Sequence, residues 1–294
     1  MEIPAVGFGC YNAKEGDNYI IIKDAIKSGY RFFDTASVYE TEDELGRALK
    51  DSGLPREDFF IQSKFWLDEM GYEGVKEAAD RALSKLKTDY IDVYLMHWPR
   101  QTPICEGAPG HPEVVPGKRV YECNPDYKTL DLECYRALED LVKEGKIKAI
   151  GLSNFLPHHL QNILDNCTIK PVVDQLEFHV GYTQLYAINF AKENGIQVEA
   201  WSPFARGDIF KDEFLKELAG KYNVSVGQLC LRFICQSGVI PLPKSTTPER
   251  QRMNLDIFDF EISTEDYHIL SSMVPCYWQH EHPDFVIPGR GTKH

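Results

Sequence analysis

The sequence predicts an α/β fold, and we expect a (β/α)8 TIM barrel with long loops at the C-terminal ends of its strands. Two observations support this prediction: eight short apolar runs alternate with helical patterns along the 294 residues, and each run is apolar almost throughout. Strands buried on both faces have such continuous apolar runs, and repeated strand–helix units build parallel sheets. These patterns alone fit an open or a closed sheet, and eight units over about 250 residues favour a barrel.

The expected elements follow one another in regular alternation. Strands are expected at residues 6–11, 31–35, 59–64, 91–97, 148–153, 172–177, 197–201 and 239–243. Helices are expected near residues 18–28, 42–51, 75–86, 129–143, 157–166, 183–194, 211–222 and 226–234. The clearest helix repeats apolar residues at i, i+3 and i+4 from Val75 to Leu86. Because no change in composition divides the chain, residues 1–294 are expected to form one domain.

One segment interrupts the alternation. Residues 99–128 contain six prolines and three glycines, without helical or strand periodicity. Loops of this length in compact domains are commonly lids or binding loops. Because the segment directly follows His97, we expect a lid over a site, and an irregular surface insertion is the alternative.

The overall charge limits the kinds of partner. With 32 basic and 45 acidic residues the net charge is −13, which argues against nucleic acid or an anionic membrane as the main partner. No apolar run approaches the ~20 residues of a membrane span, and the N-terminus lacks the features of a signal peptide. The eight cysteines are scattered without a CxxC pair, so we expect reduced thiols and a cytoplasmic location.

Polar side chains gather at the C-terminal ends of the expected strands. Asp34, Lys64 and His97 each end an apolar run, and Tyr39 follows Asp34 by five residues. In a barrel these strand ends lie on one face. Further polar or aromatic residues at or just after strand ends are Ser153, Asn154, Gln175, Glu177, Trp201, Ser202, Lys244 and Ser245. Each alone has a structural explanation, such as a helix cap or a buried core histidine, but together they favour a site.

The first four residues have a common chemical logic. A free tyrosine phenol has a pKa near ~10, which is too high for efficient acid–base work at neutral pH. A nearby ammonium lowers that pKa, and a carboxylate keeps the ammonium charged and in place. Tyr39 with Lys64 and Asp34 would then be a proton donor, and neutral His97 would orient a carbonyl oxygen. This set suits protonation of an oxygen while hydride reaches the adjoining carbon.

A nucleotide hydride donor needs a local positive site. Gly7 and Gly9 lack the later glycine and the helix of a dinucleotide fingerprint. Near the end of the chain, Lys244 and Ser245 precede an expected helix that starts at Pro248 and carries Arg250. Backbone N–H groups and cations there would bind a phosphate. The alternative is a helix cap with solvated arginines.

Five separated segments, in this order, resemble the aldo-keto reductase family along nearly the whole chain. They read GYRFFDTA at 29–36 with Tyr39 after it, DYIDVYLMHWP at 89–99, GLSNF at 151–155, DQLEFH at 174–179 and PKS at 243–245. The resemblance implies a barrel that reduces carbonyls with NADPH. It implies that Tyr39 is the general acid, that Lys64 and Asp34 tune it, and that His97 orients the substrate.

The resemblance also implies a cofactor site. Ser153, Asn154 and Gln175 would hold the nicotinamide carboxamide, and Ser202 with residues 203–208 would cover the pyrophosphate. Lys244, Ser245 and Arg250 would bind the 2′-phosphate, which favours NADPH over NADH, and Asn254 would contact the adenine. Trp201 replaces the usual tyrosine that stacks on the nicotinamide, and Asp174 replaces a usual asparagine. Because the sequence starts close to the first strand, the family's N-terminal hairpin is expected to be missing or truncated.

Aromatic residues mark the expected substrate pocket, which we assign to Tyr11, Trp66, Trp98 and Trp278. The long loops 99–128 and 272–294 would shape specificity, and the aromatic walls predict a hydrophobic or aromatic aldehyde or ketone, including steroid-like ones. No metal is expected, because His280 and His282 lack a third ligand at suitable spacing. We expect a monomer or a weak homo-oligomer.

Two other functions remain compatible with the sequence. A Schiff-base aldolase would use Lys64 as the nucleophile in the same barrel, although its Asp34 partner favours the charged amine. A non-catalytic relative would bind NADPH as a redox-sensing subunit.

Overall fold

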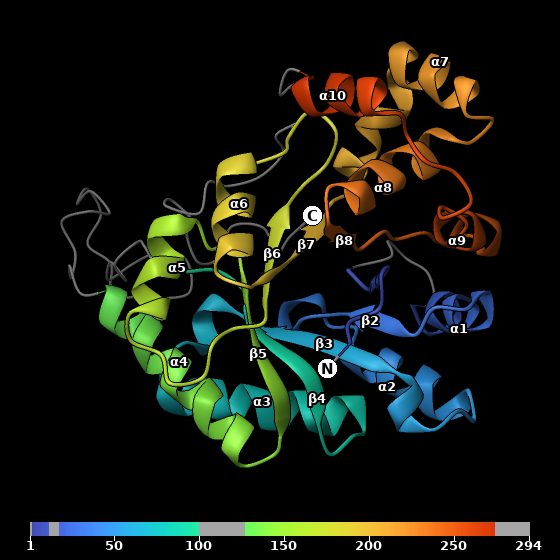
Figure 1. Cartoon of the computed structure of the whole chain (residues 1–294). Helices are drawn as coiled ribbons and strands as arrows, with labels where there is room; N and C mark the ends of the chain where they lie inside the picture. Colours follow the sequence, from blue (N-terminus) through green and yellow to red (C-terminus); the bar gives the residue numbers. More distant parts are fainter. Residues whose placement is uncertain (1, 12–17, 100–126, 274–294) are drawn as a thin grey trace, which may run out of the picture.

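The computed structural model describes residues 2–11, 18–99 and 127–273, and its centre is a parallel sheet of eight strands (Figure 1). The strands are β1 (Phe8–Gly9), β2 (Phe32–Asp34), β3 (Phe60–Phe65), β4 (Ile91–Met96), β5 (Ile147–Ser153), β6 (Val173–Glu177), β7 (Gln197–Trp201) and β8 (Val239–Pro241). Each strand pairs with the next one along the chain, always in parallel. This order places every C-terminal strand end at the same edge of the sheet, as the sequence predicts.

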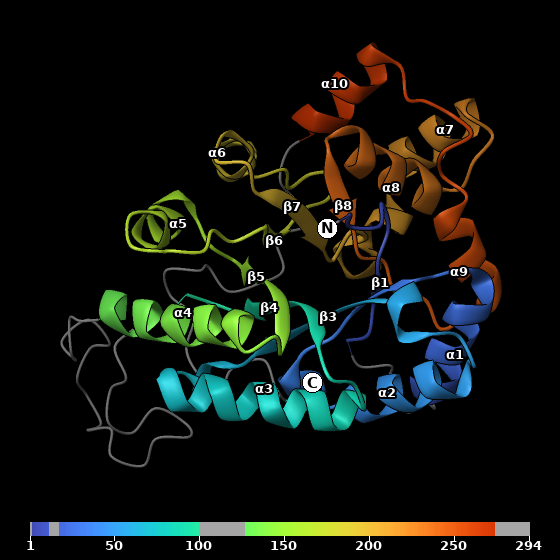
Figure 2. The ribbon, with the colours of Figure 1, turned by 60° about the horizontal axis from the view of Figure 1, so that its bottom comes forward.

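Hydrogen bonds between the first and last strand segments close the sheet into a barrel. Gly7 N donates to Pro241 O at 3.0 Å and Gly9 N donates to Pro243 O at 3.1 Å, so β1 lies against β8 (Figure 2). The backbone approaches closely at both glycines. A Cβ atom on Gly7 would lie 2.5 Å from Leu242 Cδ2, and one on Gly9 would lie 3.1 Å from the carbonyl oxygen of Leu242.

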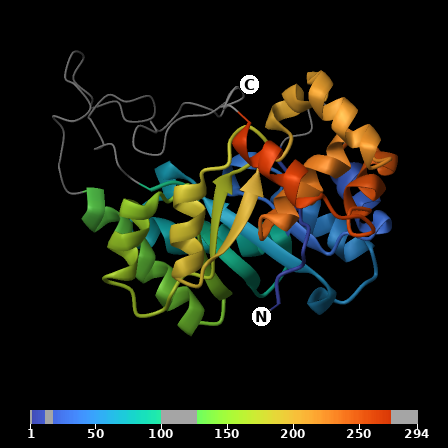
Figure 3. The ribbon, with the colours of Figure 1, turned by 45° about the horizontal axis from the view of Figure 1, so that its top comes forward.

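Helices cover the outside of the strands. They are α1 (Asn18–Ser28), α2 (Glu42–Asp51), α3 (Tyr72–Leu86), α4 (Tyr127–Lys143), α5 (Pro157–Leu164), α6 (Leu185–Glu193), α7 (Glu213–Lys221), α8 (Val226–Gln236), α9 (Pro248–Leu255) and α10 (Thr264–Ser272). In Figure 3 the green helices and the orange-red helices lie on opposite sides of the strands. None of the helices among the described residues is long and apolar enough to cross a lipid bilayer.

The helix expected at residues 211–222 is shorter than predicted. A 3-10 segment, η5 (Ala205–Lys211), occupies its beginning, and α7 starts only at Glu213. Asp212 separates the two, because its carboxylate accepts a hydrogen bond from Leu215 N at 3.1 Å and so caps α7. The polar residues before Asp212 therefore belong to the loop after β7.

The inside of the barrel changes from apolar to polar along the strands. Near the strand beginnings it is filled by a buried apolar cluster of Phe32, Phe60, Val93, Leu95, Ala149, Val173, Ile240 and Leu242. Ile3 packs against this cluster, and residues 2–7 form no strand. Because side chains alternate between the faces of a strand, the next inward residues after Phe32 and Phe60 are Asp34 and Gln62. The apolar cluster thus forms the floor below a polar layer.

Candidate active site

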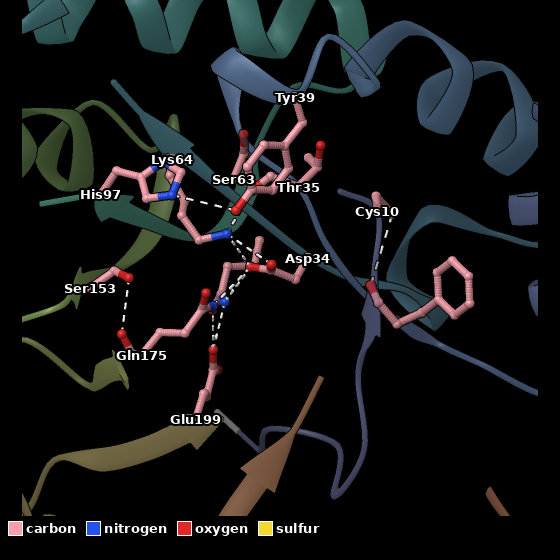
Figure 4. A network of polar contacts seen from close by, with 12 residues as sticks. Cys10, Asp34, Thr35, Tyr39, Ser63, Lys64, His97, Ser153, Gln175 and Glu199 are labelled. Atoms are coloured by element: carbon pink, nitrogen blue, oxygen red, sulfur yellow. Dashed lines mark hydrogen bonds and ion pairs between the residues drawn. The ribbon is translucent and has the colours of Figure 1, made fainter. Parts of the chain in front are cut away.

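An ion pair between Asp34 and Lys64 forms the centre of the candidate site. Asp34 ends β2, Lys64 lies on β3, and both side chains meet inside the barrel (Figure 4). Lys64 Nζ donates to Asp34 Oδ1 at 2.7 Å, to Asp34 Oδ2 at 2.8 Å and to Thr35 O at 3.0 Å. An ammonium has three N–H donors, so all of those on Lys64 are used. These contacts hold Lys64 as a fully buried, charged ammonium.

Tyr39 reaches this ion pair from a short turn after β2. It ends the 3-10 turn η1 (Ser37–Tyr39), in which Tyr39 N donates to Ala36 O, and Glu40 follows in the left-handed region with φ 57°. Lys64 Nζ lies 5.0 Å from the centre of the Tyr39 ring. The turn therefore returns the phenol to the mouth of the barrel, beside the ammonium.

The pKa of Tyr39 differs from the sequence-based expectation. We expect the ammonium to lower it, but burial raises the pKa of this phenol well above its usual value of 10.0, and the charge of Asp34 raises it further. Asp34 neutralises Lys64 at close range, so the attraction of Lys64 for a phenolate is weakened. Tyr39 is therefore protonated at neutral pH, which is the form that donates a proton.

His97 faces the Tyr39 hydroxyl from the end of β4. Its Nε2 lies 3.4 Å from Tyr39 Oη, and its side chain is buried. Burial and the charge of Lys64 hold the pKa of His97 well below its usual value of 6.5. His97 is thus a neutral imidazole, as predicted from the sequence, and its Nδ1 contacts no hydrogen-bonding group among the described residues.

Asn154 connects the ends of β4, β5 and β7. Its Nδ2 donates to His97 O at 2.9 Å and to Ser153 Oγ at 3.1 Å, and its Oδ1 accepts from Trp201 Nε1 at 3.0 Å. Ser153 Oγ in turn donates to Gln175 O at 2.9 Å. Asn154 has a left-handed backbone with φ 65°, which aims its amide across the strand ends. The indole N–H of Trp201, which a tyrosine lacks, therefore fixes the orientation of the Asn154 amide.

Gln175 belongs to a polar layer that also contains Gln62 and Glu199, two residues that are not among the predicted site residues. Its Nε2 donates to Asp34 Oδ1 and to Glu199 Oε2, both at 3.0 Å. Gln62 on β3 donates through its Nε2 to the same two carboxyl groups. Gln62 stands two residues before Lys64, and Glu199 stands two residues before Trp201. Because side chains alternate along a strand, the positions of Lys64 and Trp201 predict that Gln62 and Glu199 share their faces.

The predicted phosphate-binding residues cluster between β8 and the first turn of α9. Lys244 Nζ donates to the carbonyl oxygen of Tyr11, and burial lowers the pKa of Lys244 to about 8. Ser245 Oγ accepts from Thr247 N at 3.2 Å just before the helix, and Arg250 is exposed. Asn254 faces inward beside the hydroxyl of Tyr30 and is 6% exposed. In the loop after β7, Ser202 has a left-handed φ of 50°.

Aromatic rings surround Tyr39 and His97. The Tyr11 ring lies 4.9 Å from that of Tyr39, and the Trp66 ring lies 4.7 Å from that of His97, both edge to face. Trp98 packs with Leu67 against Trp66. Trp278, most of the 99–128 loop and nearly all of the 272–294 segment lie outside the described residues. The structure therefore brings together three of the four residues that we assign to the substrate pocket.

The part of the chain that the structure describes contains no candidate metal site. No group of three or more His, Cys, Asp or Glu side chains there has an arrangement that would hold an ion. The His280–His282 segment lies outside that part.

The catalytic, cofactor and substrate roles given to individual residues stay predictions.

Comparisons with known proteins agree on one family. The family model described as Aldo/keto reductase family matches residues 6–275. Among curated proteins, the chain is 42% identical to a glyoxal reductase of Bacillus subtilis over 267 residues, covering 90% of this chain and 87% of the relative.

Solved structures give the same result. An aldo-keto reductase from a Medee basin deep-sea metagenome superposes with a TM-score of 0.84 at 36% identity, covering 97% of each chain. A Bombyx mori aldo-keto reductase in complex with NADP superposes with a TM-score of 0.80 at 32% identity, covering 93% of this chain and 90% of that one.

Proposed function

This chain belongs to the aldo/keto reductase family, and we propose that it reduces aldehydes and ketones to alcohols with NADPH. The observation that carries the proposal is the contact of Tyr39 with both His97 and the buried Asp34–Lys64 pair at the C-terminal end of the barrel. A protonated phenol, a neutral imidazole and a fixed ammonium suit the protonation of a carbonyl oxygen.

In the proposed reaction, Tyr39 transfers its hydroxyl proton to the carbonyl oxygen. His97, protonated on Nε2, donates a hydrogen bond to the same oxygen and so positions it beside the Tyr39 hydroxyl. Lys64 stabilises the phenolate that remains on Tyr39, and Asp34 keeps the ammonium in place. NADPH, when bound, supplies the hydride that the carbonyl carbon receives. The reverse sequence would oxidise an alcohol.

The described residues fit a phosphorylated nicotinamide nucleotide. Lys244 and Arg250 provide positive charge near the N-terminus of α9, in a chain whose net charge is −13. Two cations beside backbone N–H groups suit a phosphate, and this is the reason to prefer NADPH over NADH. At the other end, the oxygens of Ser153 and Asn154 provide acceptors for an amide close to His97.

For the substrate we propose a hydrophobic or aromatic aldehyde or ketone, including steroid-like ones. Tyr11, Trp66 and Trp98 provide the apolar surface beside the reacting groups. A small dicarbonyl is the second candidate, because the B. subtilis relative is a glyoxal reductase. Comparing kcat/KM for glyoxal, phenylglyoxal and a steroid ketone separates these classes. A rate that rises from glyoxal to the larger substrates supports the aromatic pocket, and the opposite order supports the small dicarbonyl.

Replacing the proposed acid tests the mechanism directly. We expect Tyr39→Phe to lower kcat for carbonyl reduction by about 10²–10⁴-fold, the usual effect of losing a general acid, while NADPH affinity stays within a few-fold. NADPH oxidation reports the rate, and quenching of protein fluorescence reports binding. The matched control is Tyr94→Phe, which removes a buried hydroxyl that bonds no group among the described residues. Full turnover by the Tyr39→Phe protein would disprove the mechanism.

The aldolase alternative has a separate test. An imine-forming lysine must lose its charge, and the three hydrogen bonds of Lys64 to Asp34 and Thr35 oppose this. We expect borohydride treatment in the presence of an aldehyde to leave Lys64 unmodified in a peptide mass map. A borohydride-trapped adduct on Lys64 would favour the aldolase.

A further inference from the structure

A second carboxyl group, that of Glu199, lies inside the barrel close to the catalytic ion pair. Glu199 on β7 is fully buried and points toward Asp34 from across the barrel (Figure 4). Gln62 Nε2 donates to Asp34 Oδ1 at 2.8 Å and to Glu199 Oε2 at 2.6 Å, and Gln175 Nε2 donates to the same two oxygens. Two amides therefore bridge the two carboxyl groups.

The donors in this layer are completely used. An amide nitrogen has two N–H groups. Gln62 and Gln175 each donate one of them to Asp34 and the other to Glu199. Lys64 donates its three N–H groups to Asp34 and Thr35. Among the described residues, no cation therefore bonds Glu199, and an unpaired buried carboxylate is strongly unfavourable.

Two unpartnered oxygens show how this conflict is resolved. Glu199 Oε1 and Gln62 Oε1 are both buried and have no partner among the described residues, although their groups already share one hydrogen bond. A proton on Glu199 Oε1 removes the charge and turns this oxygen into an O–H donor, and Gln62 Oε1 is a buried acceptor without a partner on the side chain that already bonds Glu199. When one oxygen of a carboxyl group accepts from an amide N–H, its second oxygen can also bond the amide oxygen only if that second oxygen carries a proton.

We propose that Glu199 is a positioning residue that holds a proton, so that Asp34 is the only anion in the layer beside Lys64 and the Tyr39 phenol remains an effective acid. Loss of this proton would place a second negative charge near Lys64 and Tyr39. That charge would oppose formation of the phenolate, so carbonyl reduction would slow as the pH rises.

The surroundings of Glu199 place this ionisation near neutral pH. Burial, followed by the charge of Asp34, raises the pKa of Glu199 to about 7, while the two amides and Lys64 oppose the rise. Asp174, on the same strand as Gln175, is a further buried carboxyl near Glu199, and burial raises its pKa as well. The pKa of His97 is well below 6.5 and that of Tyr39 is well above 10.0, so neither titrates in this window.

The test is the pH profile of kcat with NADPH saturating, measured for wild type and Glu199→Gln. A glutamine reproduces the hydrogen bonds of the protonated acid at every pH. We expect wild-type kcat to fall by up to about 30-fold between pH 6 and 8.5, the loss of protonated fraction for a single group with a pKa of about 7. In Glu199→Gln this fall should shrink to less than about threefold, and in Asp174→Asn it should persist. A fall that persists in Glu199→Gln, or that disappears in Asp174→Asn, would overturn the proposal.

A second measurement does not depend on the proposed function. Because folding raises the pKa of Glu199 from 4.5 to about 7, its stabilising proton is fully present below pH 4.5 and is lost as the pH rises through 7. The melting temperature of the wild type should therefore fall relative to that of Glu199→Gln between pH 5 and 8. The control Glu139→Gln removes a buried carboxyl on α4 that accepts from Thr168 N and Ile169 N, and it should not show this relative change. If the melting temperatures of wild type and Glu199→Gln changed in parallel with pH, Glu199 would not hold the proposed proton. This outcome is independent of whether the protein reduces carbonyls.

Discussion

The two halves of the barrel interior are built from the same strands but are stabilised in opposite ways. The floor consists of Phe32, Phe60 and other apolar side chains, where each residue contributes through the area it removes from water. Above it, Asp34, Lys64 and Gln62 are equally buried, but each depends on the partner that satisfies its charge or its hydrogen bonds. A substitution in the floor therefore lowers the stability by the packing that it removes. A substitution in the polar layer instead leaves a buried charge or polar group without its partner.

The largest effect is expected from breaking the polar layer at Lys64. Lys64→Met leaves Asp34 as an unpaired buried charge, so we expect the free energy of unfolding to fall by about 3–5 kcal/mol. We also expect kcat for reduction to fall by about 10²–10³-fold, because a fixed charge beside the reacting group is lost. Urea unfolding and NADPH oxidation measure the two effects.

A double variant separates stability from chemistry in the same layer. Asp34→Asn combined with Lys64→Met removes both charges, so most of the stability should return while activity stays low. If the double variant were as unstable as Lys64→Met alone, an unpaired Asp34 would not be the cause of the instability.

A smaller effect is expected in the floor. Val93→Ala removes two buried methyl groups from the apolar cluster, which should lower the free energy of unfolding by about 2 kcal/mol. No buried charge is exposed, so kcat should change by less than about twofold at a temperature well below melting. A loss of kcat comparable to that of Lys64→Met would show that the floor and the polar layer are not energetically separate.

The smallest effect is expected at the rim, where Lys244 is half-buried. Its pKa of about 8 means that its charge is present at pH 7 and is lost as the pH rises to 9. The Kd for NADPH should therefore rise several-fold over this interval, while the Kd for NADH, which lacks the 2′-phosphate, should change little. Fluorescence titration measures both values. Lys244→Met should bind NADPH more weakly at pH 7 and lose this pH dependence, and an unaltered pH dependence would assign it to another group.

The sequence predicts the fold well because each strand is buried on both faces. Continuous apolar runs such as 91–97 locate β4 almost to the residue, and the polar residue after a run marks its C-terminal end. Boundaries fail where local contacts decide them. The cap at Asp212 shortens α7, and β1 is reduced to Phe8–Gly9 inside the longer apolar run 6–11.

The site is predicted less completely, for reasons of distance and burial. Asp34, Lys64, Tyr39 and His97 come together as expected because strand order alone brings their strand ends to one face. Glu199 is paired with Gln62 across 137 positions of sequence, so its role depends on side-chain reach inside the closed barrel. The raised pKa of Tyr39 depends on how deeply the phenol is enclosed, which no local pattern records.

The seam between β1 and β8 has a mechanical consequence. There the first strand segment bonds the last one through the N–H groups of Gly7 and Gly9. These two glycines have no side chain that could pack across the contact. Tyr11 and Lys244 stand just beyond this joint on its two sides and are linked to each other. A molecule that contacts both residues would bridge the two strand segments that close the barrel. Ligand binding at this rim would therefore also hold the first and last strand segments together.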